Sequence, residues 1–298
     1  MTGRWAPSPT GEFHLGNLRT ALLAWLFARS ENTKLLWRFE DLDGAVRNDF
    51  YDSQIRDFQR IGLNWDGQIF RQSQRLGLYQ DGIEDLIRQG LTYRCWCTRR
   101  EIREAALAPH SHLPEGAYSG RCRQLTAKEI SENERSGRNP ALRLISEGQL
   151  IRIEDRQLGD FEGAVDDFVL CRGDQTPSYN LTVVIDDADM GVTEVVRGDD
   201  LLPSTPRQVH LFHLFGLQPP RYAHVPLVLA QSGDRLAKRD GAVTIDDRVA
   251  LGESELDVLN HLLSSLQLPN IESVDELDQI IRHFRPSALP TSPWIFDL

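Results

Sequence analysis

The order of strand, loop, helix and strand at the N-terminus constrains the fold of this chain more than any other feature. Residues 4–6 form a predicted strand, which the turn formers Pro7-Ser8-Pro9-Thr10-Gly11 end. Apolar and small side chains then recur at helical spacing from Leu18 to Ala28, and Lys34 to Phe39 is a short apolar strand. Strands that alternate with helices form parallel sheets, so we expect an α/β fold built on a Rossmann-type, doubly wound parallel sheet.

The rest of the chain divides into three kinds of sequence. The helical pattern continues at about 48–62 and 75–89 and then breaks. Parallel-sheet character resumes with apolar strands and one helix, at 168–170, 192–196, 203–215 and 225–230. We predict a catalytic sheet domain at 1–90 and 166–240, an inserted subdomain at 91–165, and a short helical region at 241–298.

The composition is that of an ordinary globular enzyme. The 298 residues are 40% hydrophobic and 26% charged, which allows a sizeable core. No apolar run approaches the roughly 18 residues of a membrane span, and the N-terminus has no signal-peptide pattern. We therefore expect a cytoplasmic protein without membrane contact and, since no coiled-coil pattern is present, a monomer.

The charge is unevenly distributed along the chain. The net charge of −11 argues against a nucleic-acid partner for the chain as a whole. Residues 1–150, however, carry 21 Lys and Arg against 19 Asp and Glu, whereas 151–298 carry 12 against 25. A polyanion would favour the first half, above all the cation-rich stretch from Arg94 to Lys128, for which a solvated helical face is the alternative.

Two distant loops have the chemistry of a nucleotide site. His14-Leu15-Gly16-Asn17 lies between the first strand and a helix N-terminus, where free backbone N–H groups attract phosphate. His14 can donate a hydrogen bond to a phosphoryl oxygen, and Gly16 allows close approach of the nucleotide. The loop Arg235-Leu236-Ala237-Lys238-Arg239 holds three cations that can neutralise a leaving pyrophosphate. The predicted ATP-binding residues are His14, Gly16, Asn17, Arg235 and Lys238.

Four stretches of this chain together resemble class I aminoacyl-tRNA synthetases that activate glutamate. They are Arg4-Trp5-Ala6-Pro7-Ser8-Pro9-Thr10-Gly11 with His14-Leu15-Gly16-Asn17, Arg38-Phe39-Glu40-Asp41-Leu42-Asp43, Arg197-Gly198-Asp199-Asp200-Leu201-Leu202, and Ser204-Thr205-Pro206-Arg207-Gln208. The resemblance covers residues 3 to about 245. The first signature often ends in His, where this chain has Asn17. The second is usually Lys-Met-Ser-Lys-Ser, of which Lys238 alone keeps its place.

The resemblance implies that the enzyme adenylates an amino acid. The α-carboxylate of glutamate attacks the α-phosphate of Mg²⁺-bound ATP, a step that needs positioning and charge stabilisation but no covalent nucleophile. His14 and Lys238 are then catalytic residues that stabilise the phosphates. We find no Ser–His–Asp or Cys–His arrangement in the sequence, which agrees with such a mechanism.

The resemblance also implies a set of glutamate-binding residues. Arg4, with Arg197, holds the γ-carboxylate, for which the two-pronged guanidinium is well suited. Ser8 and Glu40 meet the backbone of the amino acid, and Glu40 pairs with its α-ammonium group. Tyr179 lines the same pocket. For Arg197 and Tyr179 a place in the core or on the surface is the alternative.

Three of the four cysteines lie close together and suggest a metal site. Cys95, Cys97 and Cys122 supply three thiolates, which suit one structural zinc ion, whereas Cys171 stands apart. Chemistry alone favours His110 or His112 as the fourth ligand. The resemblance points instead to Tyr118, because family members with Cys-x-Cys and Tyr-x-x-x-Cys use tyrosine there. Reduced thiols without a metal are the alternative.

The length of the chain bears on the acceptor. Full glutamyl-tRNA synthetases continue into a helical domain that reads the anticodon, whereas only 59 residues follow Arg239 here. We therefore expect no anticodon-binding domain. In this respect the chain resembles the glutamyl-Q-tRNA(Asp) synthetases, in which glutamate is attached to the queuosine base of tRNA(Asp). A discriminating or degenerate glutamyl-tRNA synthetase that charges a 3′ end, and a non-catalytic adaptor, are the alternatives.

Overall fold

The core of the molecule is a seven-stranded, mostly parallel sheet. The computed structural model describes residues 1–98, 100–102, 118, 120–236 and 243–296. The strands follow the order β3 (Ile69–Arg71), β2 (Lys34–Phe39), β1 (Thr2–Trp5), β9 (Glu194–Gly198), β10 (Arg221–Val225), β6 (Leu150–Asp155) and β7 (Gly159–Ala164). All neighbours from β3 to β6 are parallel, and β7 is antiparallel to β6. The predicted α/β fold is confirmed.

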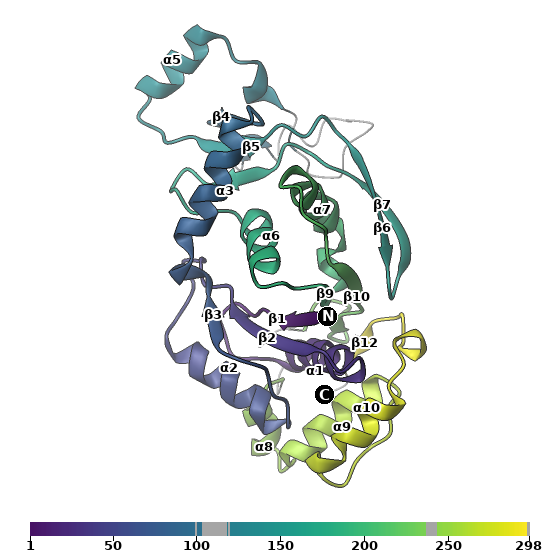
Figure 1. Cartoon of the computed structure of the whole chain (residues 1–298). Helices are drawn as coiled ribbons and strands as arrows, with labels where there is room; N and C mark the ends of the chain where they lie inside the picture. The colour runs from purple at the N-terminus through teal and green to yellow at the C-terminus, as the bar shows by residue number, and fades with distance from the viewer. Residues whose placement is uncertain (99, 103–117, 119, 237–242, 297–298) are drawn as a thin grey trace.

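Helices cover both faces of this sheet, as expected for a doubly wound fold (Figure 1). The first helix, α1 (Leu15–Ser30), packs on β1, β2 and β9, and it also contacts the C-terminal helices α9 (Glu255–Ser265) and α10 (Leu277–His283). On the opposite side lie α3 (Leu76–Arg88), α6 (Tyr179–Asp189) and α7 (Thr205–Leu214). The other α-helices bounded within the described residues are α2 (Asp49–Arg60), α5 (Ala127–Arg135) and α8 (Ile245–Ala250). The predicted helical C-terminal region is therefore present.

The alternation of side chains along the central strands gives the two faces of the sheet different chemistry. Trp5 and Trp37 are paired in register and both pack against Phe58 of α2, within the main hydrophobic core. Because side chains alternate along a strand, the preceding Arg4 and the following Arg38 point to the opposite face, towards α6. The face below α6 is therefore polar near the carboxyl ends of the strands.

A second, three-stranded antiparallel sheet corrects one expectation. It consists of β4 (Thr92–Cys95), β5 (Ala141–Leu144) and β8 (Val169–Cys171). The apolar run at 168–170 was expected to resume the parallel sheet, but β8 pairs antiparallel with β5. A short buried run shows that a strand exists but carries no information about its partner, so this prediction was wrong.

The predicted strand at 225–230 is two strands. Pro226, which has no backbone N–H to donate to a ladder, separates β10 from β11 (Val228–Leu229). The short β11 pairs with β12 (Trp294–Ile295) near the C-terminus. The hairpin β6–β7 belongs to the range 91–165, yet it lies at the edge of the main sheet; the proposed domain boundaries remain a prediction. Among the described residues, no helix combines the length and apolar character needed to cross a membrane.

Candidate active site

A cleft of about 800 Å³ opens at the carboxyl ends of β1 and β9. This is the point where the strand order reverses, β2 lying on one side of β1 and β9 on the other, and ligands of doubly wound sheets bind at such points. Nine predicted site residues line the cleft: Arg4, Ser8, His14, Gly16, Asn17, Glu40, Tyr179, Arg197 and Arg235. The tenth, Lys238, lies outside the described residues.

His14 both lines the cleft and begins helix α1. Its Nδ1 accepts a hydrogen bond from the backbone N–H of Asn17 at 3.3 Å, and the Asn17 side chain accepts one from the His14 N–H at 3.1 Å. This reciprocal capping box satisfies two of the free N–H groups at the helix start. Since Nδ1 is an acceptor, the ring proton of neutral His14 resides on Nε2, which can donate to a ligand.

The electrostatics of the cleft keep His14 neutral. Burial, with a smaller contribution from the guanidinium of Arg235, lowers the pKa of His14 to about 4. The side chain is therefore a hydrogen-bond donor and not a cation at neutral pH. Arg235, at the start of the basic loop, forms an ion pair with Asp200 at 2.9 Å, and both residues line the cleft.

Gly16 has a packing role that the sequence did not indicate. A Cβ at this position would lie 2.9 Å from both Cε1 and Nδ1 of His14 and 3.4 Å from Cβ of Val228. Contacts below 3.0 Å require the ring to shift. The glycine therefore keeps the His14 ring in its capping position, in addition to any close approach of a nucleotide.

Arg197 is a buried cation held by neutral partners. Its side chain is 5% exposed, and it donates to Nε2 of His224 at 3.1 Å, Oε1 of Gln208 at 2.8 Å and Oγ1 of Thr205 at 2.8 Å. No carboxylate of the described residues lies within ion-pair distance of this guanidinium. Two of its five N–H groups remain for a ligand, and a buried charge without a counter-ion favours an anionic one.

Asp155 fixes the orientation of His224 behind Arg197. The Nδ1 of His224 lies 2.6 Å from Oδ2 of Asp155, whose oxygens also accept the backbone N–H of His224 at 3.1 Å. Because Nε2 of His224 accepts from Arg197, its proton is on Nδ1 and points to Asp155. Burial lowers the pKa of His224, which keeps it in this neutral form.

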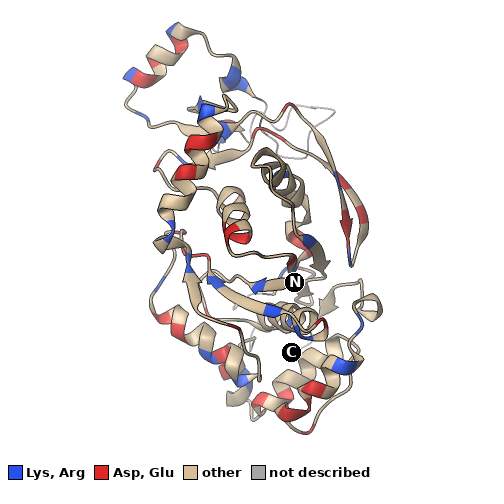
Figure 2. Ribbon diagram, viewed as in Figure 1, with Lys and Arg blue, Asp and Glu red and all other residues tan. Residues whose placement is uncertain are grey.

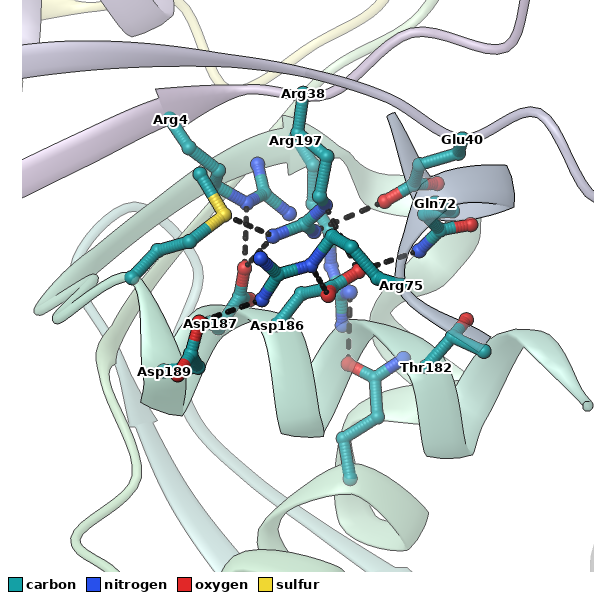
Figure 3. Close-up of polar contacts among 12 residues, drawn as sticks. Arg4, Arg38, Glu40, Gln72, Arg75, Thr182, Asp186, Asp187, Asp189 and Arg197 are labelled. Carbon is teal, nitrogen blue, oxygen red and sulfur yellow. Dashed lines mark hydrogen bonds and ion pairs between the residues drawn. The ribbon is translucent and has the colours of Figure 1, made fainter. Parts of the chain in front are cut away.

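Arg4 and Glu40 are joined beneath the cleft by a network of charged residues (Figure 3). Arg4 Nε lies 3.7 Å from Oδ1 of Asp187, and the same oxygen accepts from Arg38 Nη1 at 2.7 Å. Arg38 Nη2 donates to Oε1 of Glu40 at 3.0 Å. Asp186 lies 3.4 Å from Arg38 Nε and also binds Arg75 at 2.7 Å.

Several residues that support this site have no role predicted from the sequence. Arg38, Thr205 and Gln208 occur in the quoted motifs, but their partners were not predicted. The rule that a fully buried arginine needs a carboxylate predicts a partner such as Asp187 for Arg38, but it does not say which carboxylate of the chain this is. Asp155 and His224 carry no local signal, because they lie 69 residues apart.

The three clustered cysteines converge on one point. The Sγ atoms of Cys95, Cys97 and Cys122 all lie within 4.8 Å of one another, and those of Cys97 and Cys122 are 3.5 Å apart. The Tyr118 hydroxyl lies 3.4 Å from the sulfur atoms of both Cys95 and Cys97, and it accepts the backbone N–H of Cys122 at 2.9 Å. Three soft thiol donors and a phenol oxygen fit a closed tetrahedral metal site. His110 and His112 lie outside the described residues.

Part of the cation-rich stretch is paired within the molecule. Arg94 forms an ion pair with Glu134 at 2.7 Å, and Lys128 lies 4.0 Å from Glu132 on α5. Figure 2 shows both blue and red segments in the region of α5 and β4. Arg99 and Arg103 lie outside the described residues. The interpretation as a solvated face therefore applies to some of these cations, and a surface for a polyanion remains a prediction.

Comparison with known proteins places this geometry in a family. Residues 1–298 match the model of the catalytic domain of class I tRNA synthetases (E and Q). The chain belongs to this family of ligases.

Individual relatives show which members of the class I tRNA synthetase family the chain is similar to. A protein of Nocardia farcinica named glutamyl-Q tRNA(Asp) synthetase is 53% identical over 293 residues, which cover 98% of this chain and 92% of that protein. One of the same name from Cutibacterium acnes is 46% identical, over 92% of this chain and 78% of that protein. The solved structure of a glutamate tRNA ligase from Elizabethkingia meningosepticum, in complex with its amino acid, superposes with a TM-score of 0.82 at 26% identity, over 100% of this chain and 67% of that one. The resemblance stated from sequence is confirmed.

Proposed function

We propose that this protein uses ATP to activate L-glutamate as glutamyl-adenylate and transfers the glutamyl group to the queuosine base in the anticodon of tRNA(Asp). The names of its relatives in Nocardia farcinica and Cutibacterium acnes support this reaction and this acceptor. The single observation in the structure that carries it is Arg197, a buried cation in the cleft whose described partners are all neutral.

The cleft offers complementary charges for each part of glutamate. Arg4 and Arg197 present guanidinium groups suited to the γ-carboxylate, and Glu40 presents a carboxylate to the α-ammonium group. Tyr179, 38% exposed, borders the same cleft at the start of α6, and Ser8 lies in the loop after β1. The proposal assigns these five residues to glutamate.

The proposed activation step proceeds by in-line displacement. An oxygen of the α-carboxylate forms a bond to the α-phosphorus of ATP, the bond from that phosphorus to the bridging oxygen breaks, and pyrophosphate leaves with the electron pair. His14 Nε2–H donates to a phosphate oxygen, and Gly16 and Asn17 offer the helix N-terminus. Arg235 and Lys238 bind the pyrophosphate portion. Mg²⁺ bound with ATP supplies further neutralisation of phosphate charge.

In the proposed transfer step a hydroxyl group of queuosine attacks the carbonyl carbon of the adenylate. The new ester bond forms as the bond to the phosphate oxygen breaks, AMP leaves with the electron pair, and the hydroxyl proton is released to the solvent. The cationic stretch near α5 would meet the phosphates of the tRNA, which makes binding salt-dependent. The proposal needs one chain, so we expect a monomer, acting in the cytoplasm where tRNA and ATP are available.

The metal-site proposal is a structural zinc ion held by Cys95, Cys97, Cys122 and Tyr118. The convergence of three sulfur atoms and one hydroxyl supports this set. A bound zinc ion would crosslink β4 to the segment that holds Cys122 and so stabilise this part of the fold.

The acceptor is tested with radiolabelled glutamate, ATP and tRNA(Asp), with and without queuosine. The expected result is label only on the queuosine-containing tRNA, and nuclease mapping should recover it in the anticodon fragment. Label on the 3′-terminal fragment would instead identify a glutamyl-tRNA synthetase. Absence of glutamate-dependent ATP–pyrophosphate exchange, even with tRNA present, would identify a non-catalytic adaptor.

A further inference from the structure

Four charges of alternating sign run from one side of the cleft to the other through the protein interior. Arg4 and Glu40 line the cleft, whereas Asp187 and Arg38 lie beneath it. The contacts are 3.7 Å from Arg4 to Asp187, 2.7 Å from Asp187 to Arg38, and 3.0 Å from Arg38 to Glu40 (Figure 3). Arg38 is completely buried, so these contacts are little screened by water.

We propose that Asp187 and Arg38 are positioning residues for glutamate, which hold Arg4 and Glu40 apart and keep both charged for the two ends of the substrate. This inference rests on the proposed function, because it takes Arg4 and Glu40 as the residues that bind the substrate. Neither Asp187 nor Arg38 lines the cleft, and neither is expected to touch the ligand.

The guanidinium groups of Arg38 and Arg4 differ in how many of their donors are used by the protein, which supports a positioning role for Arg38 and a binding role for Arg4. Arg38 has a carboxylate at each nitrogen: Asp187 at Nη1, Glu40 at Nη2 and Asp186 at Nε. Within the described part of the chain, Arg4 donates only to the Val196 carbonyl, at 3.3 Å, and its buried Nε has no hydrogen bond. Arg38 is therefore committed to the protein, whereas Arg4 retains donors for a ligand.

The alternation of charges also disfavours a direct ion pair between Arg4 and Glu40 across the empty cleft. Arg4 and Glu40 carry opposite charges on largely buried side chains of one cleft and would attract each other in the absence of substrate. Each instead has an interior partner of opposite sign, Asp187 for Arg4 and Arg38 for Glu40. The two groups consequently stay available to a zwitterion whose ammonium and carboxylate groups replace the solvent.

Arg38 further determines the protonation of Glu40. Burial raises the pKa of Glu40, and the charges of Arg38 and then Arg4 oppose that shift. Asp187 and Tyr179 of α6 also face this carboxyl. Loss of Arg38 removes the largest opposing charge, so Glu40 would hold a proton at higher pH and could not pair with an ammonium group.

The first test compares Asp187→Asn with Asp189→Asn in ATP–pyrophosphate exchange. Asp189 lies on the same helix and pairs with Arg75 at 2.7 Å, and among the described residues it forms no ion pair with any of the four charges, so it is a matched control. We expect Asp187→Asn to raise KM for glutamate at least about tenfold with KM for ATP nearly unchanged. Asp189→Asn should alter neither. Equal glutamate KM values in the two variants would overturn the inference.

The second test uses the pH dependence of Arg38→Gln. We expect its KM for glutamate to fall as pH rises, because Glu40 regains its charge, while the wild type varies less over the same range. Arg38→Lys, which keeps a cation, should restore part of the affinity at neutral pH. A high KM that does not vary with pH and is not rescued by lysine would indicate a merely structural role and overturn the inference.

The proposed function and the positioning role of Asp187 and Arg38 are refuted by different results. A wild-type enzyme without glutamate-dependent exchange refutes the proposed function. A wild-type enzyme with exchange, combined with an Asp187→Asn variant that behaves as Asp189→Asn does, refutes only the positioning role. If Asp187→Asn does not fold, as judged by its thermal transition with ATP, the Arg38→Lys and Arg38→Gln pair decides the matter by the same pH criterion.

Discussion

Arg197 Nε and His224 Nε2 lie 3.1 Å apart, side by side on β9 and β10, which are paired in register at these two residues. The imidazole is a neutral acceptor because its other nitrogen faces Asp155 at 2.6 Å. A carboxylate on the β6 hairpin therefore orients an arginine of the cleft through one ring. The arrangement fixes the guanidinium without placing a carboxylate directly on it.

We expect His224→Asn to weaken glutamate binding and to destabilise the fold. The substitution removes the acceptor for Arg197 and leaves the buried Asp155 without its ring partner, a loss of about 2–4 kcal/mol in the free energy of unfolding. KM for glutamate should rise more than KM for ATP. Urea denaturation and ATP–pyrophosphate exchange measure the two effects. His210→Asn, at a buried histidine of α7 that lies outside the cleft, is the control and should spare the glutamate KM.

We expect His14 to contribute to the acid sensitivity of the fold. Its pKa is about 4 in the folded protein, mainly because of burial, and about 6.5 in an unfolded chain. Between these values the unfolded state binds more protons, so stability falls as pH decreases from about 6.5 towards about 4. His14→Asn retains a helix-capping side chain and should make the unfolding free energy less dependent on pH in this window. If urea denaturation gave the variant the same dependence of unfolding free energy on pH as the wild type, the lowered pKa of His14 would be contradicted.

Gly16→Ala should impair the nucleotide site although alanine favours helices. The new Cβ would meet the His14 ring at 2.9 Å and displace it from its cap. We expect KM for ATP to rise and KM for glutamate to change little. Gly77→Ala in α3 is the matched control, because a Cβ there meets nothing within 4 Å; it should add about 0.5–1 kcal/mol of stability. Equal ATP kinetics in the two variants would argue against the role of Gly16.

Cys122→Ser should abolish metal binding and destabilise the region around β4. Elemental analysis of the purified wild type is expected to find about one zinc per chain, and a strong chelator should lower its thermal midpoint. Cys171→Ser, at a buried cysteine outside the cluster, should keep the metal. A wild type without metal, and insensitive to chelators, would support the alternative of free thiols.

The sequence predicted those features of the fold whose determining residues lie close together along the chain. The strand Lys34–Phe39 was predicted with its observed bounds, and α1 was expected after His14, because a turn, a cap and helical spacing occur within a few residues. The antiparallel pairing of β8 was missed because strand partners are set by distant segments. The residues of the cleft were predicted from motifs shared with a known family. Their sequence spacing alone did not show that they would lie together in the fold.

The supporting residues of the site show the same limit in physical terms. Arg38 and Asp187 lie 149 residues apart, and His224 and Asp155 lie 69 apart, so no spacing rule connects them. Only the register of the strands and the placement of α6 bring these charges together. A sequence pattern can indicate that an arginine is buried, but the identity of its counter-ion becomes known only from the three-dimensional structure.

The strand order has one more consequence, for self-association. An open sheet exposes the unpaired backbone groups of its two outermost strands to other chains. Here one outermost strand, β3, has three residues, and the other, β7, carries Asp160 and Glu162. A short strand offers few hydrogen bonds to a second sheet, and charged side chains on the longer strand, one of them paired with Arg152, discourage pairing with another chain. These features of β3 and β7 disfavour edge-to-edge pairing of two sheets.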